Sequence, residues 1–120
     1  MIVEDDAALR KVYIAVLTRE GYQVEFASDG QDALRKATQN PPDLVLLDVM
    51  MPVLDGLGFL RAFDVTNTHP KTKVIMFSNS DQPEKVQEAI QLGASRYMSK
   101  YNNTPKVMAG VIREVLAEKS

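Results

Sequence analysis

The chain has 120 residues, with 14 Lys and Arg against 16 Asp and Glu, and a formal net charge of -2. This length suits one globular domain, and 45% hydrophobic with 25% charged residues argues against a disordered or fibrous chain. The absence of cysteine excludes a disulfide framework and a thiolate metal site. Direct nucleic-acid binding is disfavoured, because the chain has no block of basic residues. The apolar runs are too short to cross a membrane and no leader precedes them, so we expect a cytoplasmic protein without a membrane anchor.

Short apolar runs alternate five times with longer stretches of helical spacing, which is typical of a parallel sheet wrapped by helices. The first unit predicts a strand at 1–3 and a helix that ends before Gly21. The apolar face of this helix contains Leu9, Val12, Tyr13, Val16 and Leu17. The second unit predicts a strand at 23–27 and a helix that begins at 28–30, carries Ala33, Leu34 and Ala37 inward and ends before 41–42.

The third apolar run, 44–47, does not alternate, which suits a central strand covered on both faces, and it leads directly into Asp48. A turn-rich loop at 51–56 precedes a helix through Leu57, Leu60 and Phe63. The fourth unit predicts a strand at 74–77 that ends at Ser78, and a helix from Pro83 with Val86, Ala89 and Ile90 buried. The fifth predicts a strand at 96–99 and a helix from Thr104 with apolar positions Val107, Met108, Val111, Ile112, Val115 and Leu116.

Polar residues follow four of the predicted strands. Glu4, Asp5 and Asp6 follow the first strand, and Asp48, Ser78 and Lys100 follow the third, fourth and fifth. Because ligands of open α/β sheets gather beyond the carboxyl ends of the strands, we expect these residues to converge. Converging carboxylates repel one another unless positive charge lies among them, and a divalent cation together with Lys100 supplies it.

An oxygen-rich site of this kind favours Mg²⁺, which is held octahedrally at about 2.1 Å by one or two carboxylates, waters and phosphate. Zinc is disfavoured because the chain lacks cysteine and its one histidine, His69, lies in a polar connection. With a cation bound, the Asp48 carboxylate can act as a nucleophile toward a phosphoryl group. Lys100 would then pair with one phosphoryl oxygen and the Ser78 hydroxyl would donate to another.

Each of these residues also has an ordinary structural interpretation. The acidic run at 4–6 is favourable at a helix start, and Asp48 could cap the turn that follows its strand. Ser78 could be a turn hydroxyl and Lys100 a solvated surface lysine. The functional interpretation therefore depends on the whole set, because four such residues on four strand ends of one sheet rarely occur together by chance.

Three stretches, 2–6, 43–56 and 93–100, resemble the receiver domains of two-component response regulators, and the resemblance covers essentially the whole chain. It implies a flavodoxin-like, doubly wound fold with strand order 2-1-3-4-5 and five helices, forming one receiver domain over 1–120. It further implies that Asp48 accepts a phosphoryl group from a sensor histidine kinase or a histidine phosphotransfer protein. An output domain or protein, and a homodimer of the phosphorylated form, are further partners that the resemblance allows.

The resemblance also implies a role for each site residue. Glu4 and Asp5 arrange Mg²⁺, with Asp5, Asp48 and the backbone carbonyl of Met50 as direct ligands. Lys100 contacts the phosphoryl group. Ser78 takes the hydroxyl switch position and Tyr97 the aromatic one, whose ring turns inward once the hydroxyl has moved; from the residues alone, Tyr97 could equally be a half-buried strand tyrosine.

The chain departs from the receiver pattern at two positions. Tyr101 stands where a proline usually follows the lysine, so the cis peptide bond often found there is not implied. Asn79 replaces a small residue after the switch hydroxyl and could narrow access to Asp48 or donate a hydrogen bond to it. Both departures bear on the rate and lifetime of phosphorylation.

Two other functions fit part of the pattern. A haloacid-dehalogenase-like phosphatase also uses an aspartate nucleophile with Mg²⁺, but it requires a second aspartate two residues later, where this chain has Met50. A receiver-like scaffold that binds proteins without being phosphorylated is the second alternative, and the presence of Glu4, Asp5, Asp48 and Lys100 argues against it. We therefore predict a phosphoacceptor domain that catalyses only its own phosphorylation and dephosphorylation and is otherwise not an enzyme.

Overall fold

The computed structural model describes residues 1–51, 53–78, 82–100 and 102–118. Asn79 and Tyr101, the two departures from the receiver pattern, lie outside the described residues. Within the described ranges there are five strands and five helices. The strands are β1 (Ile2–Val3), β2 (Phe26–Ala27), β3 (Leu44–Asp48), β4 (Lys73–Ser78) and β5 (Arg96–Ser99), and the helices are α1 (Ala7–Arg19), α2 (Gly30–Gln39), α3 (Gly56–Phe63), α4 (Pro83–Gln91) and α5 (Pro105–Ala117).

The strands form one parallel sheet in the order β2-β1-β3-β4-β5, which confirms the predicted topology. The register pairs Ser78 with Ser99, the last residues of β4 and β5, and it pairs Asp48 with Phe77, so β3 ends one residue earlier. Because the strands are parallel, all of their carboxyl ends meet at the same edge of the sheet.

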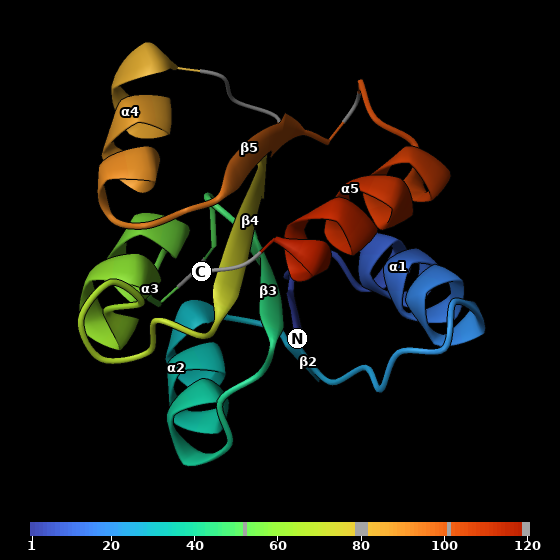
Figure 1. The fold of residues 1–120 in the computed structure, drawn as a ribbon, viewed down its shortest axis with the longest axis horizontal. Coiled ribbons are helices and arrows are strands. Elements are labelled where there is room, and N and C mark those ends of the chain that lie inside the picture. Colours follow the sequence, from blue (N-terminus) through green and yellow to red (C-terminus); the bar gives the residue numbers. More distant parts are fainter. Residues whose placement is uncertain (52, 79–81, 101, 119–120) are drawn as a thin grey trace.

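Helices cover both faces of the sheet, with α1 and α5 on one face and α2, α3 and α4 on the other (Figure 1). The central strand β3 shows why its sequence lacks alternation. Leu44 and Leu46 pack with α1 and α5, whereas Val45 and Leu47 pack with the other three helices. Every residue of β3 is buried, so a charged group at its end, such as Asp48, is held in a largely apolar setting.

Polar side chains begin four of the helices. Asp6 accepts hydrogen bonds from the backbone N–H groups of Ala8 and Leu9 at the start of α1, at 3.0 and 3.2 Å. Asp29, Asp55 and Thr104 cap α2, α3 and α5 in the same way. Of the acidic residues predicted after β1, Asp6 is therefore occupied by the helix, while Glu4 and Asp5 are left for the sheet edge.

The structure corrects several details of the predicted elements. Ile90, predicted to be buried, is 48% exposed, and Val12 and Val107, which lie on apolar helix faces, are 45% and 49% exposed. Each lies at the margin of its apolar stripe, and the stripe is wider than the surface that the helix shares with the sheet. The strand predicted at 23–27 is confined to β2, because β1 offers only Ile2 and Val3 as pairing partners.

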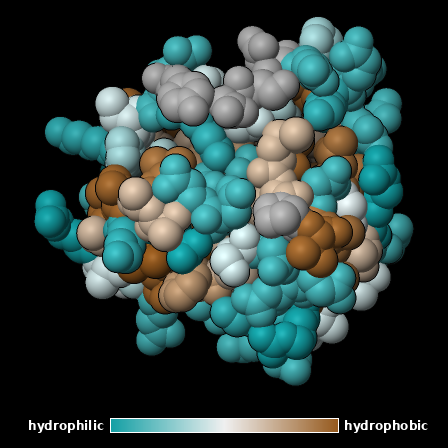
Figure 2. All heavy atoms as spheres, turned by 180° about the vertical axis from the view of Figure 1, so that it is seen from behind, coloured by the Kyte–Doolittle hydropathy of each residue, from teal (hydrophilic) through white to brown (hydrophobic). Residues whose placement is uncertain are grey.

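The far side of the molecule carries hydrophobic side chains in separate areas, divided by hydrophilic ones (Figure 2). Among the described residues, no helix is both long and apolar enough to span a bilayer. The apolar helix faces are instead used against the sheet, where they form two clusters, one on each of its faces.

Gly56 lets the first turn of α3 approach the end of β3. A Cβ atom at this position would overlap the carbonyl oxygen of Asp48 and lie 2.9 Å from the Cα of Val49, and both neighbours are backbone atoms. We predict that Gly56→Ala lowers the free energy of unfolding by about 2 kcal/mol, since the backbone must shift to accept the methyl group. Urea unfolding followed by circular dichroism measures the change.

Gly110→Ala is the matched control, because a Cβ atom there has open space within 4 Å and Gly110 lies inside α5. The control should gain about 1 kcal/mol, the difference in helix propensity between the two residues. Equal effects at the two glycines would show that the close approach at Gly56 does not matter.

Candidate functional site

The carboxyl ends of β1 and β3 bring three acidic residues together. Carboxylate oxygens of Glu4, Asp5 and Asp48 all lie within 4.8 Å of one another. Glu4 is fully buried and Asp48 is 2% exposed, whereas Asp5 is exposed to solvent. This acidic cluster, defined here as Glu4, Asp5 and Asp48, lies at the sheet edge where the sequence placed it.

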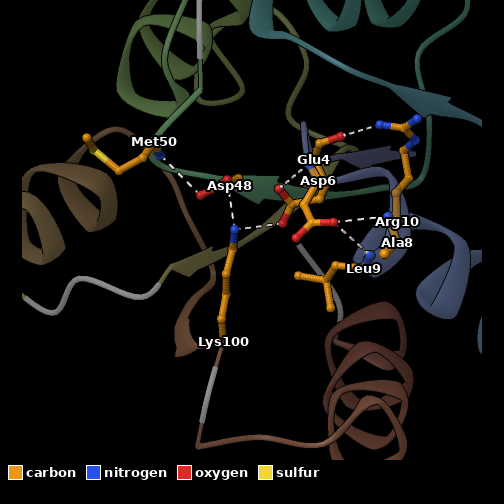
Figure 3. Close-up of polar contacts among 8 residues, drawn as sticks. All are labelled: Glu4, Asp6, Ala8, Leu9, Arg10, Asp48, Met50 and Lys100. Atoms are coloured by element: carbon orange, nitrogen blue, oxygen red, sulfur yellow. Dashed lines mark hydrogen bonds and ion pairs between the residues drawn. The ribbon is translucent and has the colours of Figure 1, made fainter.

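Lys100, which follows β5, extends into the acidic cluster (Figure 3). Its Nζ donates a hydrogen bond to Oδ2 of Asp48 at 2.8 Å and forms an ion pair with Oε1 of Glu4 at 2.7 Å. Its backbone N–H donates to the carbonyl oxygen of Ser78 at 2.9 Å, and its ammonium group lies 5.1 Å from the centre of the Phe77 ring. Lys100 is thus anchored beside β4 and is not a freely solvated lysine.

Burial and the contacts within the acidic cluster shift the pKa values of Glu4 and Lys100. Burial raises the pKa of Glu4 to about 7, against the opposing effects of Lys100 and of the Asp6 backbone N–H. Burial acts to lower the pKa of Lys100, but the nearby carboxylates of Asp48 and Glu4 outweigh it and raise that pKa above its usual value. Although Lys100 lies near, Oε1 of Glu4 accepts no hydrogen bond of normal geometry from the described residues.

Asp48 is oriented by two donors, one on each carboxylate oxygen. The backbone N–H of Met50 donates to Oδ1 at 3.1 Å, and Lys100 donates to Oδ2. Met50 itself lies in the turn after β3, with its side chain 54% exposed. The loop is closed behind it by a hydrogen bond of 2.9 Å from the N–H of Gly56 to the carbonyl oxygen of Val49.

The two expected switch residues lie on the neighbouring strands. Ser78 is the last residue of β4 and is 1% exposed, at the same edge as the acidic cluster. Tyr97 lies in β5 beside Met76, and its half-buried side chain packs against the apolar cluster formed with α2, α3 and α4. The structure therefore places Ser78 near the cluster and Tyr97 one strand further out, toward α4.

The structure places a further residue, Arg10, at this site, and no sequence motif marks it. Its Nη1 donates to the backbone carbonyl oxygen of Glu4 at 2.8 Å (Figure 3). The one feature of the sequence that could have indicated its role is its position in the first turn of α1, four residues after Asp6.

A groove of about 530 Å³ lies elsewhere, at the amino-terminal edge of the sheet between 21–25 and 40–44. None of its lining residues belongs to the acidic cluster. We place the candidate site at the acidic cluster because polar groups, charge and backbone donors converge there, whereas the groove is only a concave space.

Comparison with known proteins agrees with this geometry. The family described as "Response regulator receiver domain" matches residues 1–112. The chain belongs to this family. The chain is 36% identical over 116 residues to "Probable transcriptional regulator ycf27" of Guillardia theta, which covers 97% of the chain and 44% of that protein.

Two further receiver proteins match the chain over most of their own length. It is 34% identical over 116 residues to "Probable chemotaxis protein CheY" of Rhizobium etli, covering 92% of this chain and 87% of that protein. The crystal structure of Vibrio cholerae chemotaxis protein CheY4 superposes with a TM-score of 0.86 at 32% identity, covering 95% and 94% of the two chains. The chain thus spans less than half of the Guillardia regulator and nearly all of the chemotaxis proteins.

Proposed function

We propose that residues 1–120 form one receiver domain in which Asp48 accepts a phosphoryl group from a histidine kinase or a histidine phosphotransfer protein. The observation that carries the proposal is the paired placement of Asp48 and Lys100, with Nζ 2.8 Å from Oδ2 at the carboxyl edge of the sheet. The nucleophile and the cation that would neutralise an incoming phosphoryl oxygen are therefore adjacent before any donor arrives.

The acidic cluster fits Mg²⁺ as the cofactor. Its donors are all carboxylate oxygens, and they lie within 4.8 Å of one another. We propose that Asp5, Asp48 and the carbonyl oxygen of Met50 bind the ion directly and that Glu4 orients it. A bound Mg²⁺ would supply positive charge to phosphoryl oxygens during transfer.

The residues of the chain would then carry out the transfer by positioning. A carboxylate oxygen of Asp48 attacks phosphorus, the O–P bond forms, and the P–N bond to the donor histidine breaks with its electron pair going to nitrogen. The ammonium group of Lys100, which contacts Asp48, would transfer its hydrogen bond to a phosphoryl oxygen. Ser78 would supply a hydroxyl group at the same edge of the sheet. The chemistry of the chain is confined to its own phosphorylation and dephosphorylation.

Phosphorylation would also change the surface formed by α4 and β5. The phosphoryl group adds about -1.5 to -2 charge and three acceptor oxygens next to Ser78. We propose that the Ser78 hydroxyl moves toward these oxygens and that Tyr97 turns into the space it leaves. Output domains, output proteins or a second copy of the chain would bind the altered face in the cytoplasm.

A small phosphodonor tests the assignment of Asp48 as the acceptor. Incubation with acetyl phosphate and Mg²⁺ should add the mass of one phosphoryl group, located at Asp48 by peptide mass spectrometry. Asp48→Asn should abolish the gain, because an amide is not a nucleophile toward phosphorus. Glu114→Gln removes an exposed carboxylate in α5 and should be phosphorylated like the wild type.

The same experiment separates this proposal from its main alternative. A wild-type protein that gains no mass, while its circular dichroism shows a folded α/β protein, would favour a receiver-like scaffold that binds partners without being phosphorylated. Phosphorylation at a carboxylate other than Asp48 would refute the assignment of the acceptor.

Binding of Mg²⁺ to the acidic cluster should stabilise the folded protein. At a Mg²⁺ concentration 100 times its Kd, the free energy of unfolding should rise by about 2.7 kcal/mol over the metal-free protein, since only the folded state holds the acidic cluster together. Asp5→Asn should lose most of this rise, whereas Glu114→Gln should keep it. Urea unfolding with Mg²⁺ and with a chelator measures the difference, and an equal rise in all three proteins would contradict the assignment of the site.

The proposed movement of Ser78 and Tyr97 can be followed by nuclear magnetic resonance. A phosphoryl mimic added with Mg²⁺ should shift the amide resonances of Tyr97 and of Ile90 in α4, both away from the acidic cluster. Ser78→Ala should reduce these shifts, because the variant lacks the hydroxyl that moves toward the phosphoryl oxygens. Resonances around Ile90 and Tyr97 that stay unchanged in the wild type would show that the face is not coupled to the site.

A further inference from the structure

We propose that Arg10 is a positioning residue that fixes the peptide group between Glu4 and Asp5 and so sets the affinity of the acidic cluster for Mg²⁺. The inference deepens the proposed function and rests on it, since it assigns a residue outside the cluster to the arrangement of the metal site.

Two hydrogen bonds hold the backbone of Glu4, one at its N–H and one at its carbonyl oxygen. The N–H of Glu4 donates to the carbonyl oxygen of Ala27 in β2 at 3.1 Å. The carbonyl oxygen of Glu4 accepts from Nη1 of Arg10 at 2.8 Å, as Figure 3 shows. The first bond is part of the sheet, whereas the second depends on one side chain that reaches back from α1.

The carbonyl group that Arg10 holds belongs to the planar peptide unit that also contains the N–H of Asp5. A rotation of this plane would turn Asp5 relative to Glu4 and change the distance between their carboxylates. Glu4 is buried, whereas Asp5 is exposed and its side chain interacts with that of Glu4. The direction of the Asp5 carboxylate therefore depends on how firmly the peptide plane is fixed.

An aromatic platform holds Arg10 in this position. The Cζ atom of Arg10 lies 4.8 Å from the centre of the Phe26 ring. Lys36 approaches the same ring at 5.2 Å, and its Nζ donates to the carbonyl oxygen of Phe26 at 2.7 Å. These contacts account for an aromatic residue that is 43% exposed on the edge strand β2.

Arg10 has no competing carboxylate partner among the described residues, since the ion pairs found there involve other arginines and lysines. An arginine beside an acidic cluster that does not pair with it leaves the carboxylates available to a cation. Its guanidinium group is planar and donates along a defined direction, which suits the orientation of a single carbonyl group.

The test compares Arg10→Met, Arg10→Lys and the wild type, with Arg19→Met as a matched control at the other end of α1. In the metal-free proteins, the carbonyl carbon shift of Glu4 and the amide shift of Asp5 should move in Arg10→Met and stay in place in Arg19→Met. Mg²⁺ affinity, measured by calorimetry, should fall roughly 10-fold in Arg10→Met, the lower range for residues that orient metal ligands. Arg10→Lys should recover part of the loss, because an ammonium group can donate to the same carbonyl.

The outcomes are distinguishable from failure of the proposed function. If the wild type binds Mg²⁺ and Arg10→Met binds it equally well, the positioning role is overturned while the metal site stands. If Arg10→Met loses affinity only as much as Arg19→Met, the effect is not specific and the inference is overturned. If the wild type does not bind Mg²⁺, the proposed function itself fails, and the metal-free resonances would then report only a structural contact.

Discussion

The burial of Glu4 and Asp48 against a single lysine is the constraint on which the rest of this structure depends. Both carboxylates are almost completely removed from water, and Lys100 contacts them at 2.7 and 2.8 Å. Burying a carboxylate is costly unless it is paired, and two acids share one ammonium group here. Burial raises the pKa of Glu4, and a divalent cation bound beside it would favour the charged carboxylate.

The fold brings these groups together by parallel pairing and holds them with backbone contacts. Asp48 and Lys100 are 52 residues apart in the chain, yet each directly follows or ends a strand of the same sheet. The N–H of Met50 orients Asp48, and the carbonyl oxygen of Ser78 accepts from the backbone of Lys100. Asp48 pairs with Phe77 near the end of β4. The same strand pairs with β5, where Tyr97 lies opposite Met76.

The sequence patterns predicted the type and order of the strands and helices correctly, although the strand predicted at 23–27 is shorter than expected. The non-alternating run before Asp48 indicated a strand covered on both faces, and β3 is buried on both. Helix margins were harder, because periodicity shows which residues share a helix face but not how much of that face meets the sheet. Val12 and Ile90 are exposed for this reason. Asp6 could have joined the acidic residues or capped α1, and only the geometry of the first turn showed that it caps.

The sequence by itself determined the alternation of strands and helices, the receiver resemblance and the residues at the carboxyl edge, because these follow from residue types and their spacing. The tertiary structure decided which acids come within reach of one another, the depth at which Glu4 lies, and the contact from Arg10 across to the Glu4 carbonyl and Phe26. Those depend on distances between elements that are remote in the chain, and spacing along one helix or strand carries no information about such distances.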